Sequence, residues 1–247
     1  MNQSIGTSRA QRGRLFLGVA ALAGALSVAQ ASSAAAPAHP DFSGFWDMKF
    51  HEFVHMDDGK LPPMKPAAKA IYDERVAAIK AGRQMPDSAT SCLPHGMPRI
   101  MSTPYPMQIF QQPKVIGMMF EVNHNQRIVY MDEKLPVDPD PTYMGYSVGH
   151  WDGKTLVIET EGMNDKIQID RGGLPQSPKT HVTERLTLLD GGKRAQNKIT
   201  ITDDTLYTAP WSFTVEYRKT PYRIVEYVCD NNRAPTVEGA KNPTGFR

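Results

Sequence analysis

The sequence lacks several features on which whole classes of protein depend. Beyond the N-terminal segment no apolar run is long enough to cross a bilayer. Neither sign of charge dominates, since the formal net charge is +2, and scattered charges leave no basic face for nucleic acid. There is no Gly-x-Ser-x-Gly elbow and no glycine-rich loop between a strand and a helix. Any chemistry is therefore expected to proceed without a nucleotide or other cofactor.

Cysteine is also scarce, because the chain contains only Cys92 and Cys229. In an oxidising compartment, an even pair far apart in sequence is expected to form one long-range disulfide. Two buried free thiols are the alternative. A metal site built from cysteine alone would need more than two ligands.

The N-terminus has the pattern of an export signal. Arg12 and Arg14 precede an apolar run over residues 15–29, and small residues that suit signal peptidase follow. The two arginines are not adjacent, which favours the general secretory route over the twin-arginine route. We expect a signal peptide over residues 1–31, with cleavage as late as residue 36, and a periplasmic or secreted mature protein without a membrane span.

The rest of the chain is rich in turn-forming residues, with 20 prolines and 19 glycines in the whole sequence, and this predicts little helix. One helix is predicted over about residues 64–81, where helix-forming residues end at Gly82. A proline-rich linker over residues 84–113 follows and is expected to wrap the surface, pinned by Cys92. The tail over residues 231–247 has no core pattern and is expected to lie loose.

Alternating apolar residues predict strands in most of the remaining chain. The strongest local signal is Asp152-Gly153, since Asp-Gly suits the positive φ angles of a type I′ hairpin turn. About nine strands in sequential order predict a mainly β, single domain over residues 39–230, an antiparallel meander that closes into a barrel. A β-sandwich is the alternative. The predicted strands cover residues 45–50, 115–122, 127–131, 146–151, 155–160, 181–189, 198–202, 212–217 and 224–229.

Two histidines among these strands are candidate acid–base groups. His150 precedes the Asp152-Gly153 turn and His181 begins a strand, and histidine titrates near neutrality. For each histidine the alternative is a purely structural hydrogen bond. Three carboxylates are candidates to orient a catalytic histidine: Glu159, Glu184 and Asp165.

Carboxylates in the middle of strands are the most unusual feature of the pattern. A carboxylate that points into a barrel needs a cation, a hydrogen-bond donor or a proton, because an isolated buried charge is costly. Arg127 and Arg185 occupy comparable strand positions and are candidate partners, or candidates to bind a substrate anion. A carboxylate that points outward is an ordinary surface residue. Further candidates for contact with a substrate are Tyr130, Tyr146, Trp151, Asn164 and Glu121.

The segment His51-Glu52-Phe53-Val54-His55 matches the zinc-peptidase pattern H-E-x-x-H. That pattern requires a helix, because only there do both histidines share one face. Alternating apolar residues favour a strand here, and prolines interrupt the chain before Glu74, the candidate third ligand. A zinc-dependent hydrolase that uses His51, Glu52 and His55 is therefore a remote alternative, and no metal site is predicted.

Short motifs run through almost the whole mature chain. They include Cys92-Leu93-Pro94, Pro98-Arg99, Pro104-Tyr105-Pro106, Asp140-Pro141-Thr142-Tyr143-Met144-Gly145, Gly149-His150-Trp151-Asp152-Gly153, His181-Val182-Thr183-Glu184-Arg185 and Glu226-Tyr227-Val228-Cys229. Together they resemble a widespread family of exported, largely uncharacterised proteins of Gram-negative bacteria. The resemblance implies one exported domain and no particular activity. The strand at Trp46 also resembles the opening of lipocalin-type barrels, so the predicted barrel is lipocalin-like.

These features predict an exported barrel that binds one small molecule in its mouth. The ligand is expected to be apolar or aromatic, with or without a carboxylate. In the first hypothesis the protein is a lyase, decarboxylase or isomerase that works by proton transfer without a cofactor. In the second it is a carrier or binding protein whose polar residues only orient the ligand. The sequence leaves the oligomeric state open.

Overall fold

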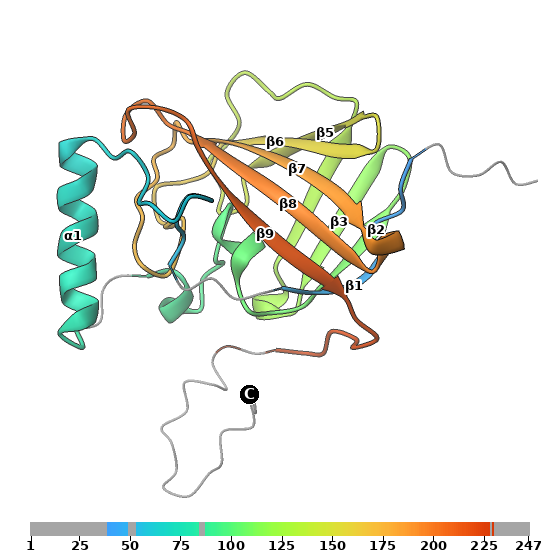
Figure 1. Cartoon of the computed structure of the whole chain (residues 1–247), viewed down its shortest axis with the longest axis horizontal. Coiled ribbons are helices and arrows are strands. Elements are labelled where there is room, and N and C mark those ends of the chain that lie inside the picture. Colours follow the sequence, from blue (N-terminus) through green and yellow to red (C-terminus); the bar gives the residue numbers. More distant parts are fainter. Residues whose placement is uncertain (1–38, 49–52, 84–86, 228, 230–247) are drawn as a thin grey trace, which may run out of the picture. The chain divides into compact units, whose positions relative to one another are not determined.

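Nine strands form one closed barrel in the computed structural model, which describes residues 39–48, 53–83, 87–227 and 229. Each strand pairs with its neighbours in sequence, and β1 pairs with β9 to close the ring (Figure 1). The predicted mainly β barrel is thereby confirmed. The strands are β1 (Gly44–Met48), β2 (Met107–Gln111), β3 (Val115–Phe120), β4 (Gln126–Met131), β5 (Tyr146–Asp152), β6 (Thr155–Glu161), β7 (His181–Leu189), β8 (Arg194–Thr202) and β9 (Trp211–Lys219).

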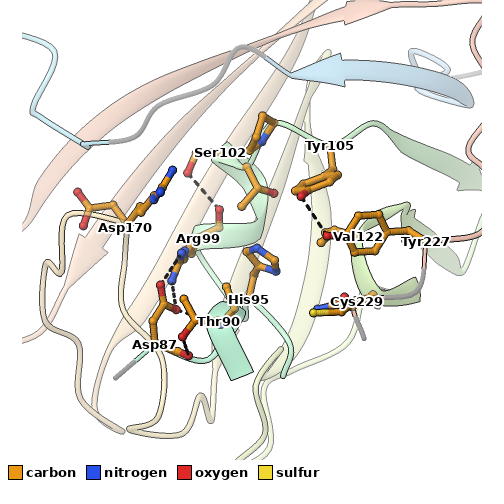
Figure 2. Close-up of a pocket in the computed structure, with 15 residues that line it drawn as sticks. Asp87, Thr90, His95, Arg99, Ser102, Tyr105, Val122, Asp170, Tyr227 and Cys229 are labelled. Atoms are coloured by element: carbon orange, nitrogen blue, oxygen red, sulfur yellow. Dashed lines mark hydrogen bonds and ion pairs between the residues drawn. The ribbon is translucent and has the colours of Figure 1, made fainter. Parts of the chain in front are cut away.

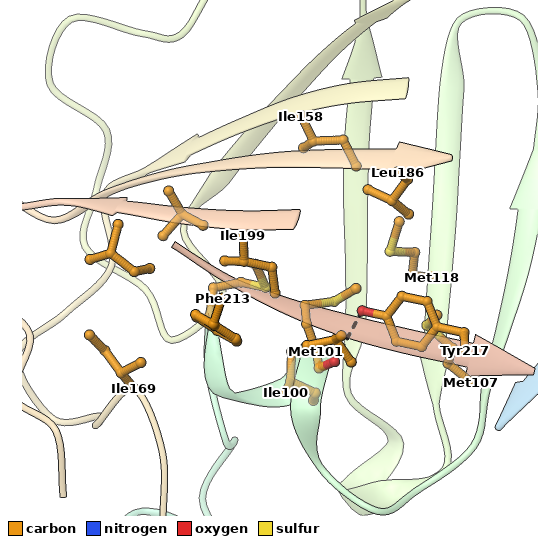
Figure 3. Close-up of a cluster of buried hydrophobic side chains, with 14 of the residues drawn as sticks. Ile100, Met101, Met107, Met118, Ile158, Ile169, Leu186, Ile199, Phe213 and Tyr217 are labelled. Carbon is orange, nitrogen blue, oxygen red and sulfur yellow. Dashed lines mark hydrogen bonds between the residues drawn. The ribbon is translucent and has the colours of Figure 1, made fainter. Parts of the chain in front are cut away.

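Alternation along each strand decides which side chains fill the barrel. In β7, Val182, Glu184 and Leu186 are buried, whereas Arg185 between them is exposed. Successive side chains of a strand point to opposite faces, so one face of every strand lines the interior. Figure 3 shows part of the resulting core, which includes Met107, Met118, Ile158, Leu186, Ile199 and Phe213.

The hairpin between β5 and β6 forms where Asp152-Gly153 predicts it, although its turn differs in detail. Asp152 pairs with Thr155, so the two loop residues are Gly153 and Lys154. Only Gly153 has a positive φ, +60°. The turn is therefore not type I′, which needs positive φ at both central residues.

One strand pair departs from the predicted antiparallel order. Strands β4 and β5 are parallel, with Val129 opposite Ser147 and Met131 opposite Gly149. Parallel neighbours need a long connection, and residues 132–145 provide it. The antiparallel order holds at every other neighbouring pair of the barrel.

Helix α1 (Pro66–Lys80) lies within the predicted range. The proline-rich linker that follows it does not simply wrap the surface. Met97, Ile100 and Met101 are fully buried, at 0 % exposure, and β2 belongs to the barrel. Prolines divide the linker into short pieces, which are too short for a repeat to mark Met97, Ile100 and Met101 as core.

The segment predicted as a last strand, residues 224–229, forms no strand in its described part. Residues 220–227, called the strap below, run irregularly along the barrel. The carboxylate of Glu121 accepts hydrogen bonds from the Tyr222 hydroxyl (2.8 Å) and from the Val225 N–H (3.0 Å). Because β1 and β9 already pair, the barrel offers no free edge to a tenth strand.

Beyond the strap, Cys229 forms the predicted disulfide with Cys92, with the Cα atoms 5.5 Å apart. No helix among the described residues is long and apolar enough to cross a membrane. The predicted signal peptide, the predicted tail over residues 231–247, and His51 and Glu52 of the zinc motif all lie outside the described residues.

Candidate functional site

The barrel wall separates the residues that the sequence suggested as one catalytic group. His150 is exposed on the outer face of β5. His181 lies on the outer face of β7, where its Nδ1 is 2.7 Å from Oε1 of Glu161 and its Nε2 is 3.7 Å from Oε1 of Glu159. Glu184 points to the interior. The structure thus brings His181 and Glu159 together on the surface and places Glu184 on the other side of the wall.

Inside the barrel, Glu184 forms an ion pair with Arg127, as expected for a carboxylate turned inward. Their side chains are 0 % and 1 % exposed. Arg127 also donates to Ser147 (3.0 Å) and Thr160 (2.8 Å), and Asn197 donates to Glu184 (2.8 Å). These bonds compensate the cost of burying two charges, so the pair belongs to the packed core.

The other residues predicted from sequence are dispersed. Arg185 pairs with Asp152 on the surface (2.6 Å), and Glu121 holds the strap. Tyr130 and Tyr146 stack on each other with ring centroids 5.1 Å apart. Trp151 stacks on His39 at 4.6 Å. Asn164 and Asp165 lie in the loop between β6 and β7, and Asp165 is exposed.

A cavity of about 240 Å³ lies where the proline-rich linker, the β6–β7 loop and the strap meet (Figure 2). Its lining combines aromatic rings with charged and polar groups: Asp87, His95, Arg99, Tyr105, Arg171 and Tyr227. None of these residues was a predicted site residue. The sequence signal for His95, Arg99, Tyr105 and Tyr227 was their place in or beside the motifs around Cys92, Arg99, Tyr105 and Cys229, whereas Asp87 and Arg171 lie outside these motifs.

The backbone beside His95 is fixed by a glycine. Gly96 has a φ of +72°, and a Cβ at that position would lie 2.7 Å from the carbonyl oxygen of Tyr143. Any larger residue would therefore be strained in this conformation. The N–H of Met97 donates to the same carbonyl at 3.0 Å. The loop consequently holds His95 in one place on the cavity wall.

His95 is a buried, neutral imidazole. His95 is only 7 % exposed. Burial, together with the nearby Arg99 cation, lowers the pKa of His95 from 6.5 to about 4. Its Nδ1 is buried and has no hydrogen-bond partner within the part of the chain that the structure describes.

Arg99 and Asp87 form a paired salt bridge next to His95. Nη1 and Nη2 of Arg99 donate to the two carboxylate oxygens of Asp87 at 2.6 and 3.0 Å, and the side chains are 6 % and 13 % exposed. Burial by itself would raise the pKa of Asp87, but the hydrogen bonds and charge of Arg99 outweigh burial and lower it. The two charges therefore neutralise each other.

Tyr105 and Tyr227 form the aromatic side of the cavity. Their hydroxyl oxygens are 3.4 Å apart and their rings meet edge to face, with centroids 5.3 Å apart. Burial and the contact with Tyr227 raise the pKa of Tyr105, so its hydroxyl keeps its proton. Since Tyr227 belongs to the strap, Glu121 and the disulfide position this side of the cavity.

Asp170 braces the loop that carries Arg171. Its carboxylate accepts hydrogen bonds from the N–H groups of Val54 (2.8 Å) and Leu174 (2.9 Å), and Figure 2 shows it directed away from His95. Burial raises the pKa of Asp170 in spite of these bonds. Asp170 therefore shapes the cavity rather than facing a ligand.

The lining suits a ligand of mixed polarity, since ring surfaces stand beside a neutral imidazole and fixed charges. The β-barrel fold is itself consistent with small-molecule binding. Among the described residues, no group of three or more histidine, cysteine, aspartate or glutamate side chains is arranged to hold a metal ion. His55, the one described residue of the three proposed for zinc, is exposed.

Comparison with models of known protein families and with curated proteins gives no match to this chain. The resemblance to an exported family therefore stays a prediction.

Proposed function

We propose that the protein binds a small, partly aromatic molecule in the cavity beside His95. The observation that carries this proposal is the buried Nδ1 of His95, which no described residue satisfies. A buried polar atom without a partner costs about 1–3 kcal/mol, and a ligand that hydrogen-bonds to it would recover that cost. Neutral imidazole can offer this nitrogen either as donor or as acceptor.

The aromatic part of the ligand would lie against rings next to His95, because the rings of His95 and Tyr105 meet edge to face with centroids 6.2 Å apart. Tyr105 and Tyr227 present rings and hydroxyl groups, and Val122 adds apolar surface. A volume of about 240 Å³ is below the range of about 300–1,000 Å³ typical for drug-sized ligands. A compound with one ring and one or two polar groups fits this space and this lining.

The proposal includes export, because the Cys92–Cys229 disulfide is compatible with an oxidising compartment outside the cytoplasm. In that compartment the disulfide keeps Cys229 close to the linker. Tyr227 lies two residues before Cys229, so the disulfide also helps to keep the binding cavity formed.

Acid–base turnover of the bound molecule is the second candidate, and His95 favours it. A neutral imidazole can accept a proton, as a lyase, decarboxylase or isomerase without a cofactor would require. A base works best when its pKa is close to the working pH, however, and the pKa of about 4 makes His95 a weak base. Binding without turnover is therefore the first proposal.

A ligand-observed NMR screen of single-ring compounds with hydroxyl, amide and carboxylate groups tests both candidates. Compounds that bind are expected to lose binding in His95→Leu and to keep it in His150→Leu, the matched change at an exposed histidine. Equal binding to the two variants, or no binding compound in the screen, would contradict the proposal. Turnover of a bound compound that disappears in His95→Gln while binding persists would promote the acid–base candidate.

A further inference from the structure

We infer that two copies of the chain associate through the outside of strands β2, β3 and β4, called the outer apolar face below. Its outward-facing residues include Phe110, Val115, Gly117, Met119, Ile128 and Tyr130. None of these residues lines the cavity beside His95. The inference therefore goes beyond the proposed function and does not depend on it.

The large apolar side chains of this face are exposed as a group. Phe110, Met119 and Ile128 are 46 %, 41 % and 40 % exposed. In the register of the sheet, Phe110 and Ile128 lie on either side of Gly117. Met119 is two residues from Gly117 and so points to the same side. Single exposed apolar residues are normal, whereas a contiguous group marks a surface for interaction.

Charge distinguishes this face from the rest of the barrel surface. Gln108 and Gln126, which also point outward here, are uncharged. The outside of strands β6–β9 carries charged side chains, among them Glu159, Arg185, Lys198, Glu216 and Arg218. At the margin of the outer apolar face, Lys114 lies 3.4 Å from Asp132. An apolar centre depleted of charge, with a polar rim, is the usual arrangement of a protein interface.

Gly117, in the middle of β3, indicates that another chain approaches this face. Gly117 does not have a positive φ, and no atom of the described chain lies within 4 Å of a Cβ built at this position. Neither the backbone nor a neighbouring residue therefore requires glycine here. A glycine inside a strand weakens the strand, and it often marks a position that another backbone or a ligand approaches closely.

The shape of the face fits a second copy of the same chain. Gly117 leaves a notch between its neighbours Phe110 and Ile128, and the exposed Phe110 ring projects beside that notch. In a two-fold contact both copies use the same surface, so every contact occurs twice. Phe110 of each copy can then fill the notch at Gly117 of the other. Two uncharged faces also meet without like-charge repulsion.

The size of the face predicts a weak dimer. Tyr146 of β5 stacks on Tyr130 and extends the face to a fourth strand, with ring centroids 5.1 Å apart. Strands about 4.8 Å apart that rise about 3.3 Å per residue then give a face of roughly 19 by 20 Å. Two copies would bury roughly 800 Å² in total, less than the about 1,200 Å² of stable interfaces. We expect a dissociation constant on the order of 10–100 µM.

Sedimentation equilibrium of the exported, disulfide-bonded protein, from about 1 µM to about 1 mM, tests the inference. The wild type is expected to change from monomer to dimer over this range. Ile128→Glu places a charge in the interface and is expected to raise the dissociation constant at least about tenfold. Lys198→Glu introduces the same residue at an exposed position in the middle of β8, and is expected to leave the constant unchanged.

Gly117→Val separates the notch from general apolar attraction. Valine suits a strand and has open space at this position, so the urea midpoint of the monomer is expected to stay the same or rise. The added side chain fills the notch and is expected to weaken the dimer about tenfold, although it adds apolar surface. If Gly117→Val strengthens association or leaves it unchanged, the notch does not receive Phe110 and the inference is overturned.

The remaining outcomes identify other occupants of the face. If the wild type stays monomeric up to about 1 mM, or if Ile128→Glu and Lys198→Glu weaken the dimer equally, the inference is overturned. Co-sedimentation with phosphatidylcholine vesicles tests a lipid surface. A monomer that binds these vesicles, and loses this binding in Ile128→Glu, would show that the face contacts lipid and would overturn the second copy as its partner.

Discussion

Acidification is expected to destabilise the protein through His95. The pKa of an unfolded histidine is about 6.5, whereas burial and Arg99 lower that of folded His95 to about 4. Between these two values the unfolded chain binds a proton that the folded chain does not, so the free energy of unfolding falls as the pH falls. The loss relative to pH 7 is about 2 kcal/mol at pH 5 and approaches about 3 kcal/mol at pH 4.

Asp170 acts in the opposite direction. Burial raises its folded pKa, so the folded state takes up a proton at a pH at which the unfolded carboxyl is still ionised. Protonation of Asp170 therefore stabilises the folded state as the pH falls. This contribution is present in the wild type and in a His95 variant alike, and it cancels when the two proteins are compared.

Urea unfolding followed by tryptophan fluorescence at pH 7, 6 and 5 measures the effect. The wild type is expected to lose about 2 kcal/mol more than His95→Gln between pH 7 and pH 5. His150→Gln, which removes an exposed imidazole that does not line the cavity, controls for the loss of one histidine. If all three proteins lose stability in parallel, His95 is not the group that binds the proton, and the neutral imidazole of the proposed site is refuted.

Two other changes test the core and the strap. Arg127→Met leaves Glu184 buried without its cation and is expected to cost about 3–5 kcal/mol. Arg185→Met breaks the exposed ion pair with Asp152 and should cost no more than about 1 kcal/mol. If urea unfolding shows equal losses of stability in the two variants, burial does not set the cost of breaking these ion pairs. Glu121→Ala removes the acceptor of the Val225 N–H and is expected to speed hydrogen exchange at that amide, by roughly tenfold or more. Unchanged exchange there would show that the disulfide alone holds the strap.

The local pattern of apolar residues and turn residues along the chain was sufficient to predict the fold class. The alternation of apolar residues, such as Val182 and Leu186 around Arg185, depends only on the two-residue repeat of a strand. The position of the β5–β6 hairpin needed only Gly153, which adopts positive φ without a steric penalty. The disulfide followed from there being only two cysteines, which leave one possible pairing.

The local sequence pattern gave wrong predictions for segments whose structure depends on residues distant in the sequence. Residues 224–229 have strand-forming composition, but strand formation requires a free edge, and the pairing of β1 with β9 removes it. The parallel pairing of β4 and β5 follows from the path of residues 132–145, which has no repeat of its own. The burial of Met97 and Met101 likewise depends on where the linker meets the closed barrel.

For the candidate site too, the sequence predicted one part and the tertiary contacts decided the rest. The sequence by itself supplied histidines, arginines and carboxylates in strands. The wall of the barrel decided that Glu184 faces Arg127 inside, whereas His181 lies half-buried on the outer face beside Glu161. His95 and Tyr227 lie beside and within the motifs around Cys92 and Cys229, but nothing in the sequence marked them as site residues, because a cavity wall has no period along the chain. Only the tertiary structure brought the linker, the β6–β7 loop and the strap together, since burial and pKa depend on neighbours in space.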